Sequence, residues 1–216
     1  MSSKKIISFV YPLILEEGTT KLGQKYEVSY ENGVKVLNSE NANYSFGSLH
    51  QIMLKGIDEV LKKHKPKKIL VLGLGAGSIL SIMKNKFKWP YTFTAVEIDA
   101  DIVRLRKEYF DEEGTDNGEI LCMDAKTAIH QLEDHRYDLI VDDVFWDNRM
   151  PEFCKELDYL KRNKTLLAKG GVYMRNSMDI ESMNHKDYEK QLSMVFSSFY
   201  SSKHPVFKNK IYFCQD

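Results

Sequence analysis

The feature that most constrains this chain is an apolar run that passes directly into a glycine-rich turn. Residues 69–72 are Ile, Leu, Val and Leu, and such a run predicts a strand buried on both faces, as in a parallel sheet. Gly73, Gly75 and Gly77 follow at once, and helical spacing begins at Ser78. A plain strand-to-helix turn needs one glycine, whereas three let the backbone approach a ligand. We therefore expect a bound nucleotide or nucleoside here, faced by unpaired N–H groups at the start of the helix.

Strand and helix patterns alternate along the rest of the chain, which predicts an α/β fold with a doubly wound, mostly parallel sheet in three layers. Two closing strands stand only two residues apart, so that pair is expected to be antiparallel. A glycine pair at 170–171 is expected to break the pattern before the strand at 172–174. The other expected strands cover residues 91–98, 119–123, 137–141, 204–207 and 210–214, and the expected helices cover residues 48–63, 100–109, 125–132, 151–167 and 187–199.

Residues 1–47 differ in pattern and predict a small N-terminal β-appendage. Short β-type runs occupy residues 6–11 and 26–30, and Glu31-Asn32-Gly33 is a hairpin signal before the run at 34–37. We therefore divide the chain into an appendage at residues 1–47 and a nucleoside-binding domain at residues 48–216. The apolar side chains of the appendage could be covered by a second copy of the chain, so a homodimer is one expectation; these are Phe9, Tyr11, Leu13 and Leu15.

Composition narrows the class of protein. Lys and Arg total 31 and Asp and Glu total 31, so no basic excess points to nucleic acid as the partner. Three widely spaced cysteines favour reduced thiols over a disulfide frame, and hence a cytoplasmic protein. No stretch is apolar enough to predict a membrane span.

The carboxyl ends of the expected strands carry acids, and ligands of such sheets bind at those ends. Glu97 ends the second strand and can accept hydrogen bonds from both ribose hydroxyls, whereas Asp99 fits a helix cap better. Asp124 can bind an adenine amino group while Ala125 leaves room for the ring, although Asp124 could instead cap the next helix. Of Asp142 and Asp143 at the fourth strand end, one is expected to face the ligand and to bind an amine or accept its proton.

Other nucleotide sites and metal sites fit the pattern less well. Ser78 stands where the dinucleotide fingerprint has its third glycine, which argues against NAD. The Gly-Lys-Ser/Thr ending of a phosphate loop is absent, and the six histidines form no ligand-spaced pair, so we expect no metal site.

Four segments taken in order resemble the spermidine synthase-like group of class I S-adenosylmethionine-dependent methyltransferase folds. They are VLGLGAGS at 71–78, AVEID at 95–99, MDA at 123–125 and YDLIVDDVF at 137–145, and later segments up to residue 176 fit as well. The resemblance implies a seven-stranded Rossmann-like sheet with an antiparallel last strand. It also implies an adenosyl ligand over the glycine turn, with Glu97 at the ribose and Asp124 and Ala125 at the adenine. Asp143 matches the family's proton-accepting aspartate.

Departures from the family pattern affect the expected reaction. Ala76 stands where the family carries the aspartate that holds the aminopropyl amine, and Val144, Phe145 and Trp146 replace polar residues after Asp143. Asp147 is displaced by one position from the family's second acid, and Asn41 stands near a family glutamine. A missing partner for a buried ammonium costs several kcal/mol of binding, which argues against aminopropyl transfer to putrescine.

Three functional hypotheses follow. The first is a methyltransferase that moves a methyl group from S-adenosylmethionine to a small-molecule acceptor, with Asp143 orienting or deprotonating the nucleophile. The second is a divergent aminopropyltransferase that uses decarboxylated S-adenosylmethionine and an amine acceptor. The third is a non-catalytic domain that binds nucleosides. The acceptor pocket is expected to be formed by the appendage, residues 144–150 and residues 176–186.

Overall fold

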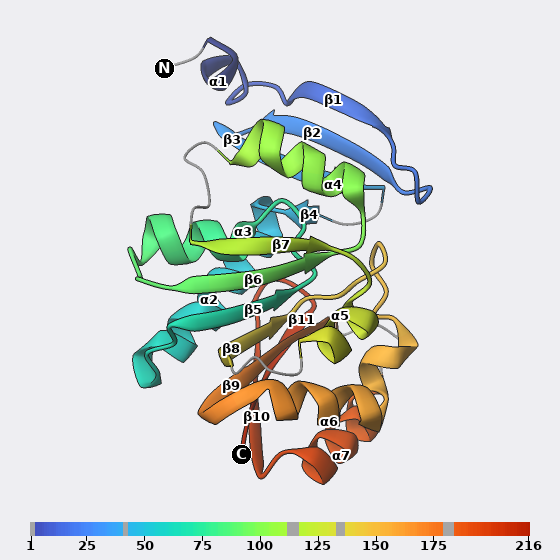
Figure 1. Cartoon of the computed structure of the whole chain (residues 1–216). Helices are drawn as coiled ribbons and strands as arrows, with labels where there is room; N and C mark the ends of the chain where they lie inside the picture. Colours follow the sequence, from blue (N-terminus) through green and yellow to red (C-terminus); the bar gives the residue numbers. More distant parts are fainter. Residues whose placement is uncertain (1–2, 41–42, 112–116, 133–136, 179–183) are drawn as a thin grey trace.

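The computed structural model describes residues 3–40, 43–111, 117–132, 137–178 and 184–216 (Figure 1). The first elements, in chain order, are α1 (Ser3–Ile7), β1 (Leu13–Thr19), β2 (Lys25–Glu31), β3 (Val34–Ser39), β4 (Asn43–Ser45), α2 (Gly47–Lys63), β5 (Lys68–Leu72), α3 (Ser78–Ser81), η1 (Ile82–Lys86) and β6 (Thr92–Glu97). The others are α4 (Ala100–Leu105), η2 (Arg106–Phe110), β7 (Gly118–Cys122), α5 (Ala125–Gln131), β8 (Tyr137–Asp142), η3 (Glu152–Lys155), α6 (Leu157–Leu166), β9 (Leu167–Met178), α7 (His185–Val195), β10 (Ser198–Lys203) and β11 (Asn209–Gln215). Within these ranges, no helix is both long and apolar enough to cross a membrane.

The central sheet has seven strands in the order β10-β11-β9-β8-β5-β6-β7. Strands β5 to β9 pair in parallel, and β11 runs antiparallel to both β9 and β10. The expected mostly parallel seven-stranded sheet in three layers is therefore confirmed. The chain moves outward from β5 to β7 and then returns to β8 on the other side of β5. This reversal places a ligand-binding crevice at the carboxyl ends of β5 and β8.

Two apolar layers hold the sheet between helices. Alternate residues of one strand face opposite sides, so Leu70 and Leu72 pack toward α5, α6 and α7, while Ile69 and Val71 pack toward α2 and α3. All four side chains are fully buried, as expected for a strand covered on both faces. Figure 1 shows α2 and α3 on one side of the sheet and α5, α6 and α7 on the other. Packing in these two apolar layers holds β5, and with it the start of the glycine turn, in place.

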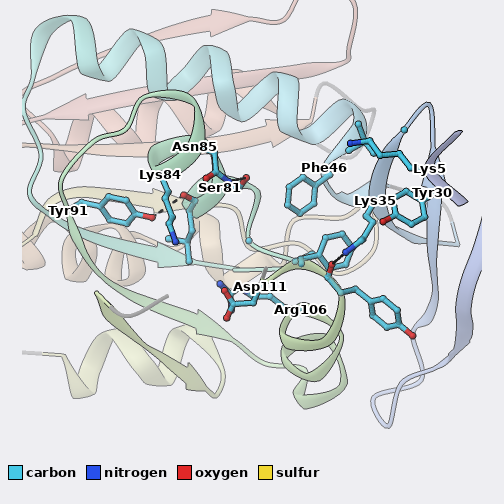
Figure 2. A pocket seen from close by; sticks show the side chains of 17 residues that line it. Lys5, Tyr30, Lys35, Phe46, Ser81, Lys84, Asn85, Tyr91, Arg106 and Asp111 are labelled. Carbon is cyan, nitrogen blue, oxygen red and sulfur yellow. Dashed lines mark hydrogen bonds and ion pairs between the residues drawn. The ribbon is translucent and has the colours of Figure 1, made fainter. Parts of the chain in front are cut away.

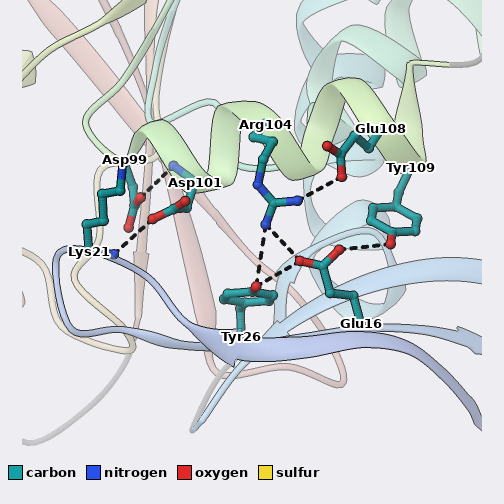
Figure 3. A network of polar contacts seen from close by, with 8 residues as sticks. All are labelled: Glu16, Lys21, Tyr26, Asp99, Asp101, Arg104, Glu108 and Tyr109. Atoms are coloured by element: carbon teal, nitrogen blue, oxygen red, sulfur yellow. Dashed lines mark hydrogen bonds and ion pairs between the residues drawn. The ribbon is translucent and has the colours of Figure 1, made fainter.

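A separate four-stranded antiparallel sheet, β1-β2-β3-β4, docks on α4 and η2. Its Lys35 Nζ donates to the Tyr109 carbonyl oxygen over 2.7 Å (Figure 2). On the other side, Glu16 accepts hydrogen bonds from Arg104, Tyr26 and Tyr109 at 2.7, 2.8 and 2.8 Å (Figure 3). These contacts tie the sheet to the helix that follows β6, next to the crevice.

The N-terminal run at 6–11 is not a strand, contrary to expectation. Residues Ser3–Ile7 form the short helix α1, and a turn leads to β1 only after Pro12. Proline lacks the N–H needed for a strand ladder, and the pairing of β1 with β2 covers residues 13–19. Ser8 instead binds the β2–β3 hairpin, because its carbonyl and hydroxyl oxygens accept from the N–H groups of Asn32 and Gly33, each over 3.0 Å.

Three expected boundaries in the C-terminal half also differ. The helix expected over 151–167 is split into η3 and α6, because Glu156 between them is extended. The glycine pair does not end a pattern but forms a bulge inside β9, where the register moves from Tyr137–Leu167 to Leu139–Val172. The last helix ends at Val195, so the strand expected at 204–207 lies instead at Ser198–Lys203 and pairs antiparallel with β11.

Candidate functional site

A cavity of about 920 Å³ opens at the carboxyl ends of β5, β6 and β8. Six of the seven residues expected to form the site line it, namely Gly73, Gly75, Glu97, Asp124, Ala125 and Asp143. Gly77 is the exception, because it lines a second cavity on the other side of the turn. The carboxylates of three neighbouring strand ends therefore border one hollow, while their roles in binding remain predictions.

The glycine turn adopts backbone conformations that side chains seldom allow. The φ angle is 79° at Gly73, 55° at Gly75 and 91° at Gly77. A Cβ atom at Gly73 would also lie 2.4 Å from the carbonyl oxygen of Asp143. Glycine at this position thus lets the turn pass closely beside the end of β8.

All N–H groups of residues 73–77 donate to acceptors within the protein. The bonds, 2.6–3.0 Å long, run from Gly73 and Leu74 to the Val96 carbonyl, from Gly75 to Glu97 Oε2, from Ala76 to Ser45 Oγ and from Gly77 to the Leu74 carbonyl. Phe46 N–H in turn donates to Ser78 Oγ over 2.6 Å. Hydrogen bonds to β6, and to the segment at the end of the N-terminal sheet, therefore hold the turn in place. The unpaired N–H groups expected at the start of the helix belong to Ser78 and the residues that follow it, and that expectation stays a prediction.

Glu97 is buried at the end of β6, with only 7% of its surface exposed. Its carboxylate accepts hydrogen bonds from the N–H groups of Gly75 (2.9 Å) and Asp99 (3.1 Å). Burial raises the pKa of Glu97, and these N–H donors oppose the rise. Glu97 is thus fixed in orientation, and its remaining lone pairs can accept from a ligand hydroxyl.

Asp99 and Asp124 both cap helices and both line the cavity. Asp99 Oδ1 accepts from the N–H of Asp101 over 2.9 Å, and Asp124 Oδ2 accepts from the N–H of Thr127 over 3.0 Å. The helix cap expected of Asp99 is confirmed. For Asp124 the cap and the adenine contact are compatible, because each carboxylate oxygen offers a second lone pair.

The two adjacent acids after β8 face opposite environments. Asp142 is fully buried, pairs with the buried guanidinium of Arg175 and accepts from the hydroxyl of Tyr173 over 2.6 Å. Asp143 turns toward the cavity instead. Arg175 was missed from the sequence. An arginine directly after the apolar run 172–174 signals a buried carboxylate partner, and the β8–β9 register places Arg175 beside Asp142.

Asp143 has the chemistry of a general base near neutral pH. Burial raises its pKa to about 7, against the hydrogen bond from Asn176 and the charge of Arg175, which lower it. Asn176 Nδ2 donates to Asp143 Oδ1 over 2.8 Å, and Asn209 Nδ2 donates to Asn176 Oδ1 over 3.1 Å. A carboxylate with a pKa close to the working pH can take a proton from a nucleophile.

Gln24, in the β1–β2 connection, is a site residue that sequence patterns did not reveal. It lines the cavity and is buried, and its Oε1 has no hydrogen-bond partner among the described residues. The same holds for Asp99 Oδ2. Buried acceptors are normally paired, so these two oxygens fit a ligand that carries hydroxyl or amine donors.

Aromatic and aliphatic side chains form the outer wall of the cavity. They are Phe145, Trp146, Met150, Phe153, Met178, Val206 and Phe207. The expected contribution of residues 144–150 is thus present, and residues 206–209 of the β10–β11 connection add to it unexpectedly. Asp147 lies there too and accepts from Ser39 Oγ over 2.7 Å. Asn41 and residues 179–183 lie outside the described residues.

The described lining has a clear excess of acids. The ionisable side chains are Glu97, Asp99, Asp124, Asp143, Asp147 and Glu152 on one side and Arg149 and Lys208 on the other. The chain as a whole is formally neutral, so this excess is local. A concave site with such a charge favours cationic ligands.

Comparison with known proteins agrees with this geometry. Residues 48–214 match the family model described as "Spermine/spermidine synthase domain". A polyamine aminopropyltransferase from Vibrio vulnificus is 29% identical over 143 residues, which are 65% of this chain and 47% of that protein. The chain therefore aligns with about half of the length of this curated relative.

Solved structures share the fold. Human methyltransferase-like protein 13 in complex with SAH has a TM-score of 0.67 at 26% identity, covering 78% of this chain and 82% of that one. A probable spermidine synthase from Corynebacterium glutamicum has a TM-score of 0.69 at 22% identity, covering 95% and 77%. Because the family model spans most of the chain, from α2 to the end of the sheet, this protein belongs to the spermine/spermidine synthase domain family, a family of transferases.

Proposed function

We propose that the protein transfers an aminopropyl group from decarboxylated S-adenosylmethionine to an amine. The observation that carries this proposal is the excess of acids in the cavity. The donor has a sulfonium and an ammonium group, and the acceptor has at least one amine, so every reacting molecule is cationic near neutral pH. Acidic walls attract such molecules and stabilise them when bound.

The glycine turn supports a donor without a carboxylate. S-adenosylmethionine carries a carboxylate that needs N–H donors, but the N–H groups of residues 73–77 are already bound within the protein. The name of the Vibrio relative also favours aminopropyl transfer over the methyl transfer that the substitution at Ala76 suggested. Aminopropyl transfer is therefore the preferred specific reaction.

The roles of the lining residues follow from their positions. Glu97 would accept from the ribose hydroxyls, and Asp124 would accept from the adenine amino group beside the small side chain of Ala125. Gly73 and Gly75, which lack side chains, would let the backbone approach the bound ligand closely. The unpaired oxygens of Gln24 and Asp99 would accept from further hydroxyl or amine donors, which supports the fit of an adenosyl ligand to these residues.

Asp143 would act on the acceptor amine. The bound donor supplies a carbon activated by its sulfonium group. The amine nitrogen forms a bond to that carbon, the carbon–sulfur bond breaks with its electron pair staying on sulfur, and the amine proton passes to Asp143. Asn176 keeps the carboxylate directed at the cavity, over 2.8 Å. Most of the acceleration would come from holding the two molecules in line.

The test is to incubate the purified protein with an amine (putrescine, a longer diamine or a polyamine) and with one donor at a time. The donors are decarboxylated S-adenosylmethionine and S-adenosylmethionine. Mass spectrometry of the nucleoside product distinguishes the reactions. The expected result is methylthioadenosine from the decarboxylated donor, lost in Asp143→Asn and retained in the control Asp187→Asn, because Asp187 on α7 is not among the described residues that line the cavity. Absence of methylthioadenosine with every amine would refute the proposal.

Methyl transfer from S-adenosylmethionine is the second candidate. The aromatic outer wall favours it, since such a wall suits a less charged acceptor. The likeness to methyltransferase-like protein 13 points the same way. S-adenosylhomocysteine as the product in the same experiment would establish it. Binding of either donor without any product would instead support the non-catalytic nucleoside-binding domain.

A further inference from the structure

A second cavity, of about 620 Å³, lies on the other side of the glycine turn. Figure 2 shows it between α3 and η1, the η2 segment and the β2–β3 hairpin. Ala76 and Gly77 of the turn line it, whereas Gly73 and Gly75 line the first cavity. The two cavities have no described lining residue in common, so the second is a separate site.

The charge of this second cavity is opposite to that of the first. Of the described residues that line it, Lys5, Lys35, Lys84 and Arg106 are cationic and only Asp111 is anionic. The chain as a whole has no net charge, so the cations are concentrated here. A concave surface lined in this way attracts anions.

Arg106 provides an independent indication of a ligand. Its side chain is buried, with 5% of the residue exposed, and Nη1 lies 3.4 Å from Asp111 Oδ2. Its Nε has no hydrogen-bond partner among the described residues. Nε lies over Gly77, where a Cβ atom would be only 2.9 Å away. A buried guanidinium offers five N–H donors and is costly to leave poorly paired, so an acceptor in the cavity would stabilise it.

Aromatic rings form the wall of the cavity beside these cations. Phe46 stacks on Phe110 with ring centroids 5.1 Å apart and an interplanar angle of 11°. Tyr30 and Tyr91 complete the wall, and the Tyr91 hydroxyl donates to the Leu80 carbonyl over 3.0 Å. We propose that this cavity binds a small organic anion, with a phosphate or carboxylate group at Arg106 and a planar or apolar part against Phe46 and Phe110.

Binding is tested on the full chain with phenyl phosphate, benzoate and phenol as probes, by calorimetry and by the shift in melting temperature. We expect phenyl phosphate, benzoate or both to bind at millimolar concentration or below, and we expect no binding of phenol. Whichever anion binds more tightly identifies the acidic group. Equal binding of phenol, or no binding of either anion, would overturn the proposal.

Variants locate the bound anion. Arg106→Gln should abolish binding, and Lys5→Glu at the edge of the cavity should weaken it by a factor of about 3 to 10. Lys107→Glu is the matched control, because Lys107 is exposed on the same segment and does not line the cavity. Equal weakening by Lys5→Glu and Lys107→Glu would contradict the assignment, even if Arg106→Gln failed to fold.

The first cavity must be excluded as the place of binding. Asp124→Asn alters the lining of the acidic cavity at a residue whose carboxylate binds Thr127 and not the glycine turn, so it should leave the affinity for the anion unchanged. Saturating S-adenosylhomocysteine should likewise have no competitive effect. Loss of anion binding in Asp124→Asn would place the anion in the first cavity and refute the second site, whatever the outcome of the transferase assay.

Discussion

Replacing Asn176 by Ala should move the pH profile of the reaction to higher pH without abolishing activity. In the native protein the pKa of Asp143 is about 7, so kcat/KM should rise about tenfold per pH unit below that value and only about twofold from pH 7 to 9. The base must be ionised to act, which fixes the sign of the effect. Besides Asn176, the charged groups that act on Asp143 are Arg175, Asp142 and Glu97, and Asn176→Ala leaves all three in place.

The size of the shift follows from the lost hydrogen bond. Asn176 Nδ2 donates over 2.8 Å to the ionised form, and such a bond to a charged group contributes about 1.5 kcal/mol or more. This corresponds to an increase in pKa of about one unit. At pH 7 the ionised fraction of Asp143 would then fall from about one half to about one tenth, a fivefold loss of kcat/KM that should largely disappear at about pH 9.5.

The assay is the product measurement described above, run from acidic to alkaline pH. Asn209→Ala serves as the control, because the side chain of Asn209 donates to Asn176 rather than to Asp143. The pH profile of this variant should keep the native midpoint. A ¹³C NMR titration, with Asp143→Asn used to assign the resonance, measures the same pKa without substrate. An unchanged midpoint in Asn176→Ala, or a native midpoint near the ordinary value for aspartate, would refute the reasoning.

Three further predictions concern stability. Gly73→Ala should lower the melting temperature more than Gly170→Ala. Both residues have a positive φ, at which an alanine costs about 1–2 kcal/mol, but only at Gly73 would the new Cβ clash with a neighbouring atom. Equal losses of melting temperature in the two variants would contradict the clash. The pKa of Glu16 is lowered to about 2, chiefly by its bond to Arg104, so the stability it contributes is present above the ordinary value of 4.5 and is lost as the pH falls through about 2. Urea unfolding should show that Glu16→Gln removes about 1–2 kcal/mol of this acid-sensitive stability, a value that allows for the partial exposure of the Glu16–Arg104 pair. If the free energy of unfolding of the variant had the same pH dependence as that of the native protein, the effect would be excluded. Asp142→Asn should cost about 3–5 kcal/mol in the same measurement, because it leaves a buried guanidinium without its charge partner, and a cost below about 1 kcal/mol would disprove that pairing.

The central strands and the acids at their ends could be predicted because their local pattern and their environment agree. Residues 69–72 are apolar without interruption, and β5 is covered on both faces. Acids at the carboxyl ends of parallel strands lie at the same edge of the sheet, and β6 and β8 flank β5 on either side, which is why Glu97 and Asp143 border one cavity. The division of the chain at residue 47 and the binding roles of the lining residues stay predictions.

The errors arose where distant contacts decide the structure. Residues 6–11 have a β-type composition but no strand to pair with, so part of them is helical. The glycine pair at 170–171 forms a bulge only because β8 fixes the register on both sides of it. Gln24 occurs in ordinary sequence surroundings, so only the folded chain reveals its place. Arg175 follows an apolar run that signals a buried partner, but its pairing with Asp142 depends on the β8–β9 register. The methyl-transfer hypothesis rested on Ala76 and on Val144, Phe145 and Trp146, and it did not include the acidic lining of the cavity. It stays the second candidate.

The two short bonds between Ser45 and Ala76 and between Phe46 and Ser78 have a consequence for the order of assembly. They join segments about thirty residues apart, and they secure the loop from strands that precede it in the chain. Strand β5 and its neighbours can therefore associate early, whereas the loop reaches its final shape only after the N-terminal strands have arrived. A fragment that begins at α2 would keep the sheet but would have a loosened loop, and the ligand recognition proposed for this loop would then be the last property acquired during folding and the first one lost.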